Sequence, residues 1–149
     1  MAGQERRLRK ELEALAKDPP ETVGAAPYSE DDLRLWKGHV LGAEGTPHER
    51  GFFQLEMSFP ADYPFVAPKV RFITHVYHPN VRANAISAGF LADEWSPVLT
   101  VEKVLLSVQS LLATPDLDKV VNDEAARLYK EDRTAYDEKA REVTQRYAM

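Results

Sequence analysis

The segment from Tyr77 to Thr100 constrains the fold more than any other part of the chain. It reads YHPNVRANAISAGFLADEWSPVLT and shows neither a helical repeat nor the alternation of a strand. Pro79 fixes its own φ and favours an extended conformation at His78, and Asn80 is a residue type that stabilises loops. The pattern predicts a long ordered loop inside a compact domain, and such loops are often functional.

The residues before this loop predict a helix and then a sheet. Leucines recur at helical spacing within Gln4–Lys17, and the Asp-Pro-Pro sequence that follows ends this helix. Three later runs have the composition of strands, at 33–41, 52–59 and 69–73, and the second alternates apolar and polar residues. We predict an antiparallel four-stranded meander, in which the sequence itself places three strands.

The residues after the loop predict three helices. Thr100 is a good N-cap for a helix over Val101–Ala113, which is apolar around most of its circumference and is therefore predicted to be the buried central helix. Asn122 and Asp132 are placed to cap two C-terminal helices. The order of elements favours the α+β class and a single domain over residues 1–149.

Composition excludes several kinds of function. The chain has no cysteine, so disulfides, thiolate metal sites and thiol catalysis are excluded. Its four histidines form no pattern of ligands, and we expect no metal site. A net charge of −5 gives no reason to expect nucleic acid as a partner, and no apolar run is long enough for a membrane span. The first residues lack an apolar signal region, and we expect a cytoplasmic or nuclear protein.

Several motifs resemble those of ubiquitin-conjugating enzymes along essentially the whole chain. They are the HPN of residues 78–80, the WSP of 95–97, the YPF of 63–65, the PKV of 68–70 and the closing RYAM. The resemblance implies that the protein accepts ubiquitin from the activating enzyme and passes it to substrate lysines together with a ligase. It also implies that no cofactor is bound, since the activating enzyme uses the ATP.

The segment between HPN and WSP departs from the family pattern. Family members carry a cysteine there within Asn-Gly-x-Ile-Cys, and this chain has no cysteine and is about one residue short. Ser87 falls on the cysteine position if the shortening lies before Ile86, and Ala88 does if it lies after. Three hypotheses follow: an inactive variant, an active family member with an altered loop, or a protein that holds ubiquitin as an ester on Ser87.

The resemblance suggests roles for other residues of the site. Asn80 matches the asparagine that stabilises the oxyanion or holds the loop. His78 is the nearest candidate base for Ser87. The loop after the central helix carries acids in the family that steer the incoming lysine, and here Lys119 occupies the expected place of one acid while Asp118 lies beside it.

The resemblance also suggests partner-binding residues. The first helix, with Arg6, Arg7 and Lys10, would meet the activating enzyme and in part the ligase. Phe65 lies between prolines, and Ser96-Pro97-Val98 follows a tryptophan, so both segments are rigid loops that would present apolar groups to RING-type ligases. The alternative to a transfer enzyme is therefore a catalytically inactive variant that acts as a binding module in ubiquitin chain assembly. Another expected partner, if the chain is itself active, is such an inactive variant.

Overall fold

A computed structural model describes residues 2–149 of the chain. The chain forms a helix, then the strands of a sheet, then a long loop and three further helices. The elements are α1 Ala2–Lys17, β1 Val23–Ser29, β2 Asp32–Leu41, β3 Phe52–Ser58, β4 Lys69–Phe72, β5 Val81–Arg82, β6 Ala85–Ile86, the 3₁₀ helix Gly89–Leu91, α2 Val101–Ala113, α3 Asp123–Glu131 and α4 Arg133–Tyr147.

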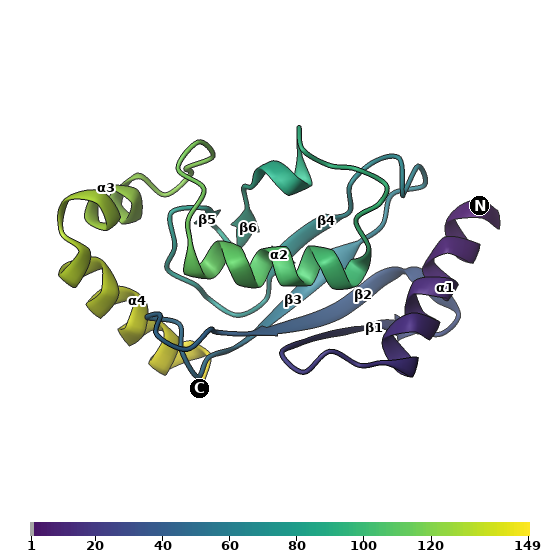
Figure 1. Ribbon diagram of the computed structural model, residues 1–149, viewed down its shortest axis with the longest axis horizontal. Coiled ribbons are helices and arrows are strands. Elements are labelled where there is room, and N and C mark those ends of the chain that lie inside the picture. Colours follow the sequence, from purple (N-terminus) through teal and green to yellow (C-terminus); the bar gives the residue numbers. More distant parts are fainter. Residues whose placement is uncertain (1) are drawn as a thin grey trace.

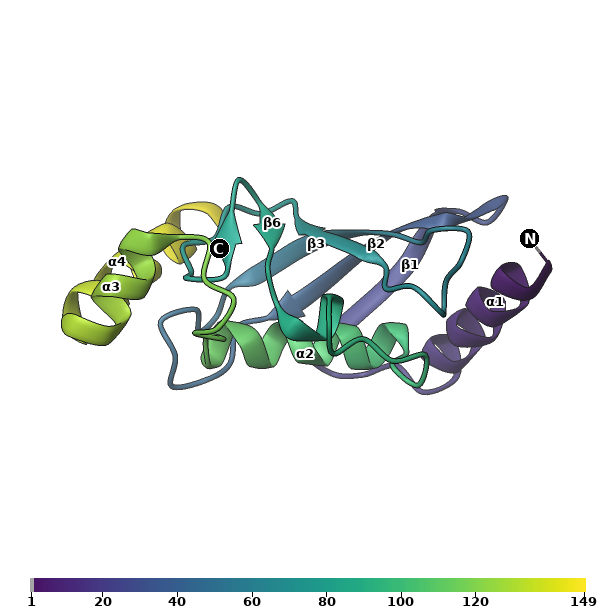
Figure 2. The same ribbon diagram turned by 90° about the horizontal axis from the view of Figure 1, so that it is seen from above.

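The strands form one antiparallel sheet in the order β1-β2-β3-β4-β6-β5. Helix α2 runs across one face of this sheet, α1 stands at one end of it, and α3 and α4 lie at the other end (Figure 1). Seen from above, no helix of residues 2–149 covers the face of the sheet opposite α2 (Figure 2). The long loop after β6 returns along the covered side of the sheet to α2 (Figure 2).

The core lies between the sheet and α2. Phe53, Leu55 and Met57 alternate along β3 and are fully buried, as are Val104 and Leu105 of α2. This burial of large apolar side chains supplies most of the stabilisation of a domain of this size. A second, smaller cluster joins α3 and α4 to the start of the long loop, and its buried members are Tyr77, Ala125, Tyr136 and Ala140.

The α+β prediction is confirmed, and so are the three predicted caps. The Thr100 hydroxyl accepts a hydrogen bond from the Lys103 N–H at the start of α2. The side chains of Asn122 and Asp132 do the same at the starts of α3 and α4. These local signals could be read because capping requires only a few neighbouring residues.

The strand count differs from the four-stranded prediction. The sheet has six strands, because a short β5–β6 hairpin adds to the edge beyond β4. Strand β1, which the sequence did not place, contains Pro27 and small residues that weaken a strand pattern. It lies at the opposite edge of the sheet, where a proline is tolerated because one side of the strand needs no partner.

Within residues 2–149, no helix is both long and apolar enough to cross a membrane.

Candidate functional site

The histidine of the HPN motif lies in the interior with both ring nitrogens bonded. His78 is fully buried, its Nδ1 accepts the Asn80 N–H at 3.0 Å, and its Nε2 lies 2.7 Å from the Leu111 carbonyl oxygen. This arrangement requires a proton on Nε2 and none on Nδ1. Burial, together with the neighbouring His48 ring, lowers the pKa of His78 to about 3. The geometry therefore gives His78 a positioning role and leaves no free nitrogen to act as a base for Ser87.

The asparagine of the motif is also fully buried, and its amide holds the loop after α2. Its Nδ2 donates to the carbonyl oxygens of Asp116 at 2.8 Å and Lys119 at 3.0 Å. Its Oδ1 accepts the Asp116 N–H at 2.9 Å. Both N–H donors of this amide therefore have acceptors inside the protein. Of the two roles suggested for Asn80, this geometry supports the holding of the loop.

The β5–β6 hairpin explains how the shortened segment folds. Val81 pairs with Ile86, and Ala83 and Asn84 form the turn between the strands with φ values of 49° and 67°. A two-residue hairpin turn of type I′ needs positive φ at both positions, which asparagine tolerates well and alanine poorly. This tight turn lies before Ile86, which favours placing the missing residue there. With the shortening before Ile86, Ser87 and not Ala88 falls on the cysteine position.

Ser87 itself lies at the surface beside the HPN motif. Its N–H donates to the Asn80 carbonyl oxygen at 2.8 Å, and the residue is half-buried, whereas Ala88 is 3% exposed. Ser87 lines an open pocket with Arg82, Val120 and other residues of the hairpin and the α2–α3 loop. The geometry thus presents a hydroxyl at this position, in a pocket that Asp123 also lines.

Asp118 and Lys119 belong to the α2–α3 loop, which also contributes Val120 to the Ser87 pocket. Asp118 is exposed, and its N–H donates to the Asp116 side chain at 3.1 Å. The Lys119 Nζ lies 3.2 Å from Asp93 Oδ1 and forms an ion pair that lowers the pKa of the Asp93 carboxyl. Lys119 therefore links the α2–α3 loop to the long loop, while Asp118 forms no ion pair within residues 2–149.

A second candidate site is formed by two loops near α1. Phe65 is 80% exposed on the β3–β4 loop, and Val98 is 70% exposed on the loop before α2. The Trp95 Nε1 donates to the Pro64 carbonyl oxygen at 2.9 Å and joins the two loops. We call Phe65, Pro97 and Val98 the apolar loop tips. The sequence predicted both segments as exposed apolar loops, and Phe65 and Val98 are indeed exposed.

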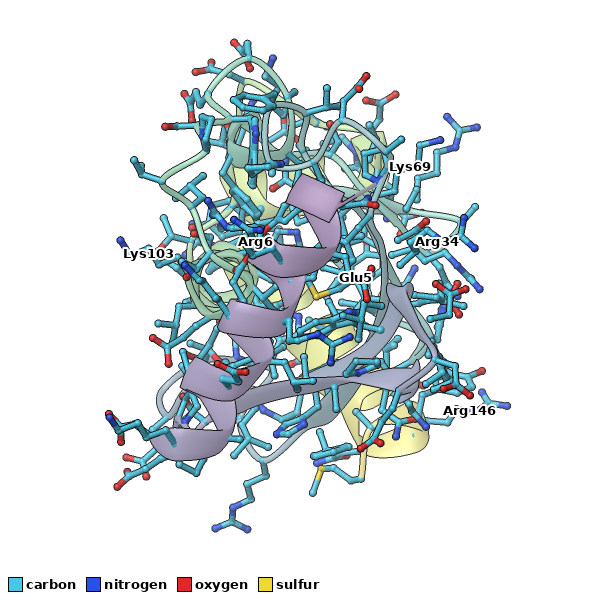
Figure 3. The ribbon with its side chains drawn as sticks, turned by 90° about the vertical axis from the view of Figure 1, so that its right-hand side faces the viewer. Glu5, Arg6, Arg34, Lys69, Lys103 and Arg146 are labelled. Atoms are coloured by element: carbon cyan, nitrogen blue, oxygen red, sulfur yellow. The ribbon has the colours of Figure 1, made fainter. Side chains whose placement is uncertain are left out.

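The predicted cations of α1 divide into two kinds. Arg6 and Lys10 are exposed, and the view onto α1 shows Arg6 on the helix with Lys103 to one side and Arg34 and Lys69 to the other (Figure 3). Arg7, in contrast, makes internal bonds. Its guanidinium donates to the Pro97 carbonyl oxygen at 2.7 Å and pairs with Glu11 at 2.9 Å. A substitution at Arg7 would therefore disturb the loops as well as remove a surface charge.

The comparison with protein families decides the identity of this architecture. The family model "Ubiquitin-conjugating enzyme" matches residues 7–144, which include the sheet, the HPN loop, α2, α3 and most of α1 and α4. The chain belongs to the ubiquitin-conjugating enzyme family.

Membership of the ubiquitin-conjugating enzyme family places the protein in ubiquitin conjugation, with ubiquitin, activating enzymes and ligases as the general classes of partner. Within this family match, the chain has no cysteine at any position. The fold and the HPN scaffold are therefore present together with a site that lacks a thiol.

Proposed function

We propose that the protein is a binding member of the ubiquitin-conjugating enzyme family, which engages RING-type ligases without carrying ubiquitin as a thioester. The observation that carries the proposal is the absence of any thiol from a chain whose apolar loop tips are intact. A thioester needs a sulfur nucleophile, and no other side chain can form one. The binding role requires only the surface.

The apolar loop tips support ligase binding because their large side chains are exposed and do not serve the core. Phe65 and Val98 project from loops that are joined to each other through Trp95 and Pro64. A rigid, exposed aromatic and aliphatic pair is typical of a protein interface, and one aromatic anchor can contribute more than about 2 kcal/mol to binding. The exposed cations Arg6 and Lys10 on α1 would attract an acidic partner, such as the activating enzyme.

In this role the protein would work beside an active conjugating enzyme in ubiquitin chain assembly. It would do so in the cytoplasm or nucleus. The protein would need no bound cofactor there, because ATP is consumed by the activating enzyme.

A second candidate function is the holding of ubiquitin as an ester on Ser87. It is favoured by the half-buried position of Ser87 against the Asn80 backbone. In that reaction the Ser87 oxygen would attack the thioester carbonyl of charged activating enzyme, lose its proton to solvent and release the enzyme's thiol. The bonded nitrogens of His78 weigh against this reaction, because a serine hydroxyl needs a base.

Calorimetric titration of the protein against a panel of RING domains tests the binding role. We expect Phe65→Ala to raise the Kd for the tightest binder by about tenfold or more. The matched control is Phe52→Ala, which removes a 44% exposed phenylalanine from β3 and should leave the Kd unchanged. Melting temperatures of both variants show whether they are folded. A panel without any binder, or a Phe65→Ala variant that binds as the wild type does, contradicts the proposal.

A further inference from the structure

Helix α1 presents polar side chains to the protein interior at positions where an amphipathic helix would carry apolar ones. Gln4 and Glu11 are only 6% and 7% exposed. The Gln4 Nε2 donates to the Phe59 carbonyl oxygen at 3.1 Å and to that of Pro60, at the start of the β3–β4 loop. Burial of polar groups is unfavourable unless they are bonded, so these side chains are expected to have specific partners.

The buried carboxylate of Glu11 joins three separate segments. Its Oε2 accepts the Tyr63 hydroxyl at 2.6 Å and the Arg7 Nε–H at 2.9 Å, and its Oε1 accepts the Val101 N–H at 2.6 Å. Val101 is the first residue of α2, where the N–H groups have no partner within the helix and a carboxylate is favourable. Glu11 thus binds α1 to the β3–β4 loop and to the start of α2.

The Tyr63 hydroxyl remains a donor under ordinary conditions. Burial, with the hydrogen bond and negative charge of Glu11, raises the pKa of the Tyr63 phenol. Tyr63 lies only 2% exposed, and two residues later the chain reaches the exposed Phe65. The bond from Tyr63 to Glu11 therefore fixes the base of the loop whose tip carries Phe65.

Arg7 extends the same connection to the other loop. Beyond its bond to Glu11, its guanidinium donates to the carbonyl oxygens of Pro97 at 2.7 Å and Leu99 at 3.3 Å. These carbonyls lie on either side of Val98, whose side chain is 70% exposed. Each apolar loop tip is thus attached to α1 through backbone or side-chain groups next to it, and both attachments meet at Glu11.

We infer that Glu11 is a positioning residue that sets the placement of Phe65 relative to Val98, and so the affinity for ligases. This inference rests on the proposed function and adds the residue that organises its surface. The loop tips are exposed and have little packing of their own, so hydrogen bonds at their bases determine where they lie. A well-ordered surface loses less conformational entropy on binding than a mobile one.

Glu11→Gln tests this inference, because it keeps the size of the side chain while removing its charge and one acceptor oxygen. We expect the Kd for the tightest RING domain to rise about fivefold, which corresponds to the loss of about one hydrogen bond. Tyr63→Phe removes only one of the three donors and should raise the Kd about twofold to threefold. The control is Glu13→Gln on the exposed side of α1, with no expected change. Backbone amide shifts in nuclear magnetic resonance spectra should change mainly in residues 60–68 and 96–101.

A double-mutant cycle with Phe65→Ala separates positioning from general destabilisation. If Glu11 acts by placing Phe65, then Glu11→Gln should have little further effect on the Kd once Phe65 is alanine. Equal effects of Glu11→Gln in both backgrounds would overturn the inference, as would an unchanged Kd in the single variant. If Glu11→Gln does not fold, Tyr63→Phe decides in the same cycle.

The same cycle distinguishes failure of the inference from failure of the proposed function. A Phe65→Ala variant that binds normally contradicts the ligase surface itself. A Phe65→Ala variant that binds weakly, beside a Glu11→Gln variant that binds normally, contradicts only the positioning role of Glu11.

Discussion

The HPN loop and the apolar loop tips use their side chains in opposite ways. In the HPN loop, His78 and Asn80 are fully buried and bonded inside the protein. At the loop tips, Phe65 and Val98 are 80% and 70% exposed and contribute little to folding. The difference teaches that the fold itself accounts for the buried, bonded residues of the HPN motif, whereas exposed apolar side chains require an explanation outside the fold.

The structural work of the HPN loop extends to its backbone. The Pro79 carbonyl oxygen accepts the N–H groups of Val121 and Asn122, both at 3.0 Å, just before α3. Together with the amide of Asn80, these bonds connect the loop to both ends of the segment between α2 and α3. Loss of this connection should therefore change stability, and loss of the loop tips should not.

The largest expected effect on stability is that of Asn80→Ala. The substitution removes three hydrogen bonds from a fully buried side chain and should lower the free energy of unfolding by about 3 kcal/mol. Urea unfolding measures this change, with the exposed Gln145→Ala on α4 as the control. A loss below about 0.5 kcal/mol, within the range of ordinary surface substitutions, would break the structural interpretation of the motif.

The next effect is a loss of stability in acid that comes from a buried histidine beside the motif. His48 is 1% exposed, its Nε2 lies 3.3 Å from the Tyr77 carbonyl oxygen, and burial lowers its pKa to about 4. An unfolded histidine takes up its proton near pH 6.5, so between about pH 6.5 and 4 the unfolded state binds more protons. Stability is therefore present above this window and falls as the pH drops through it.

His48→Gln should remove about 1.5 kcal/mol of the stability lost between pH 6.5 and 5, since one histidine contributes at most about 1.4 kcal/mol per pH unit and reaches that slope only below pH 6.5. Unfolding by urea at a series of pH values gives this slope. The exposed Gln145→Ala serves again as the control and should retain the slope of the wild type. The same slope in His48→Gln and the wild type would show that other groups cause the loss in acid.

The smallest expected effect is a gain in stability at the hairpin turn. Ala83 has a φ of 49°, a conformation that glycine adopts more easily than alanine. Ala83→Gly should raise the free energy of unfolding by about 1 kcal/mol without changing ligase affinity. The exposed Ala61→Gly, at a position without positive φ, should be neutral or destabilising. A destabilised Ala83→Gly variant would contradict the turn geometry on which the assignment of Ser87 depends.

Local chemistry accounts for the parts of the fold that the sequence predicted. The caps at Thr100, Asn122 and Asp132 depend on residues three positions away, and the exposure of Phe65 follows from its flanking prolines. Strand β1 was not located because its small residues and proline are stabilised by pairing with β2, which a propensity pattern does not show.

Long-range contacts account for what the sequence could not predict. Arg7 was assigned to a partner surface, and its direction inward is set by carbonyl oxygens that lie 90 and 92 residues later in the chain. The buried position of Glu11 depends likewise on Tyr63 and Val101. The sequence prediction did not use the spacing of Gln4, Arg7 and Glu11, which places them on one side of α1 beside Leu8.

The most direct test of the central claim is an assay for covalent ubiquitin. The protein is incubated with activating enzyme, ATP and ubiquitin, with and without a bound RING domain, and separated without reductant. The positive control has a glycine inserted after Asn84 together with Ser87→Cys, which restores the thiol and the length of the family pattern. We predict no adduct on the wild-type chain, as on Ser87→Ala. A base-labile adduct that Ser87→Ala abolishes would show instead that Ser87 carries ubiquitin as an ester, and would contradict the account.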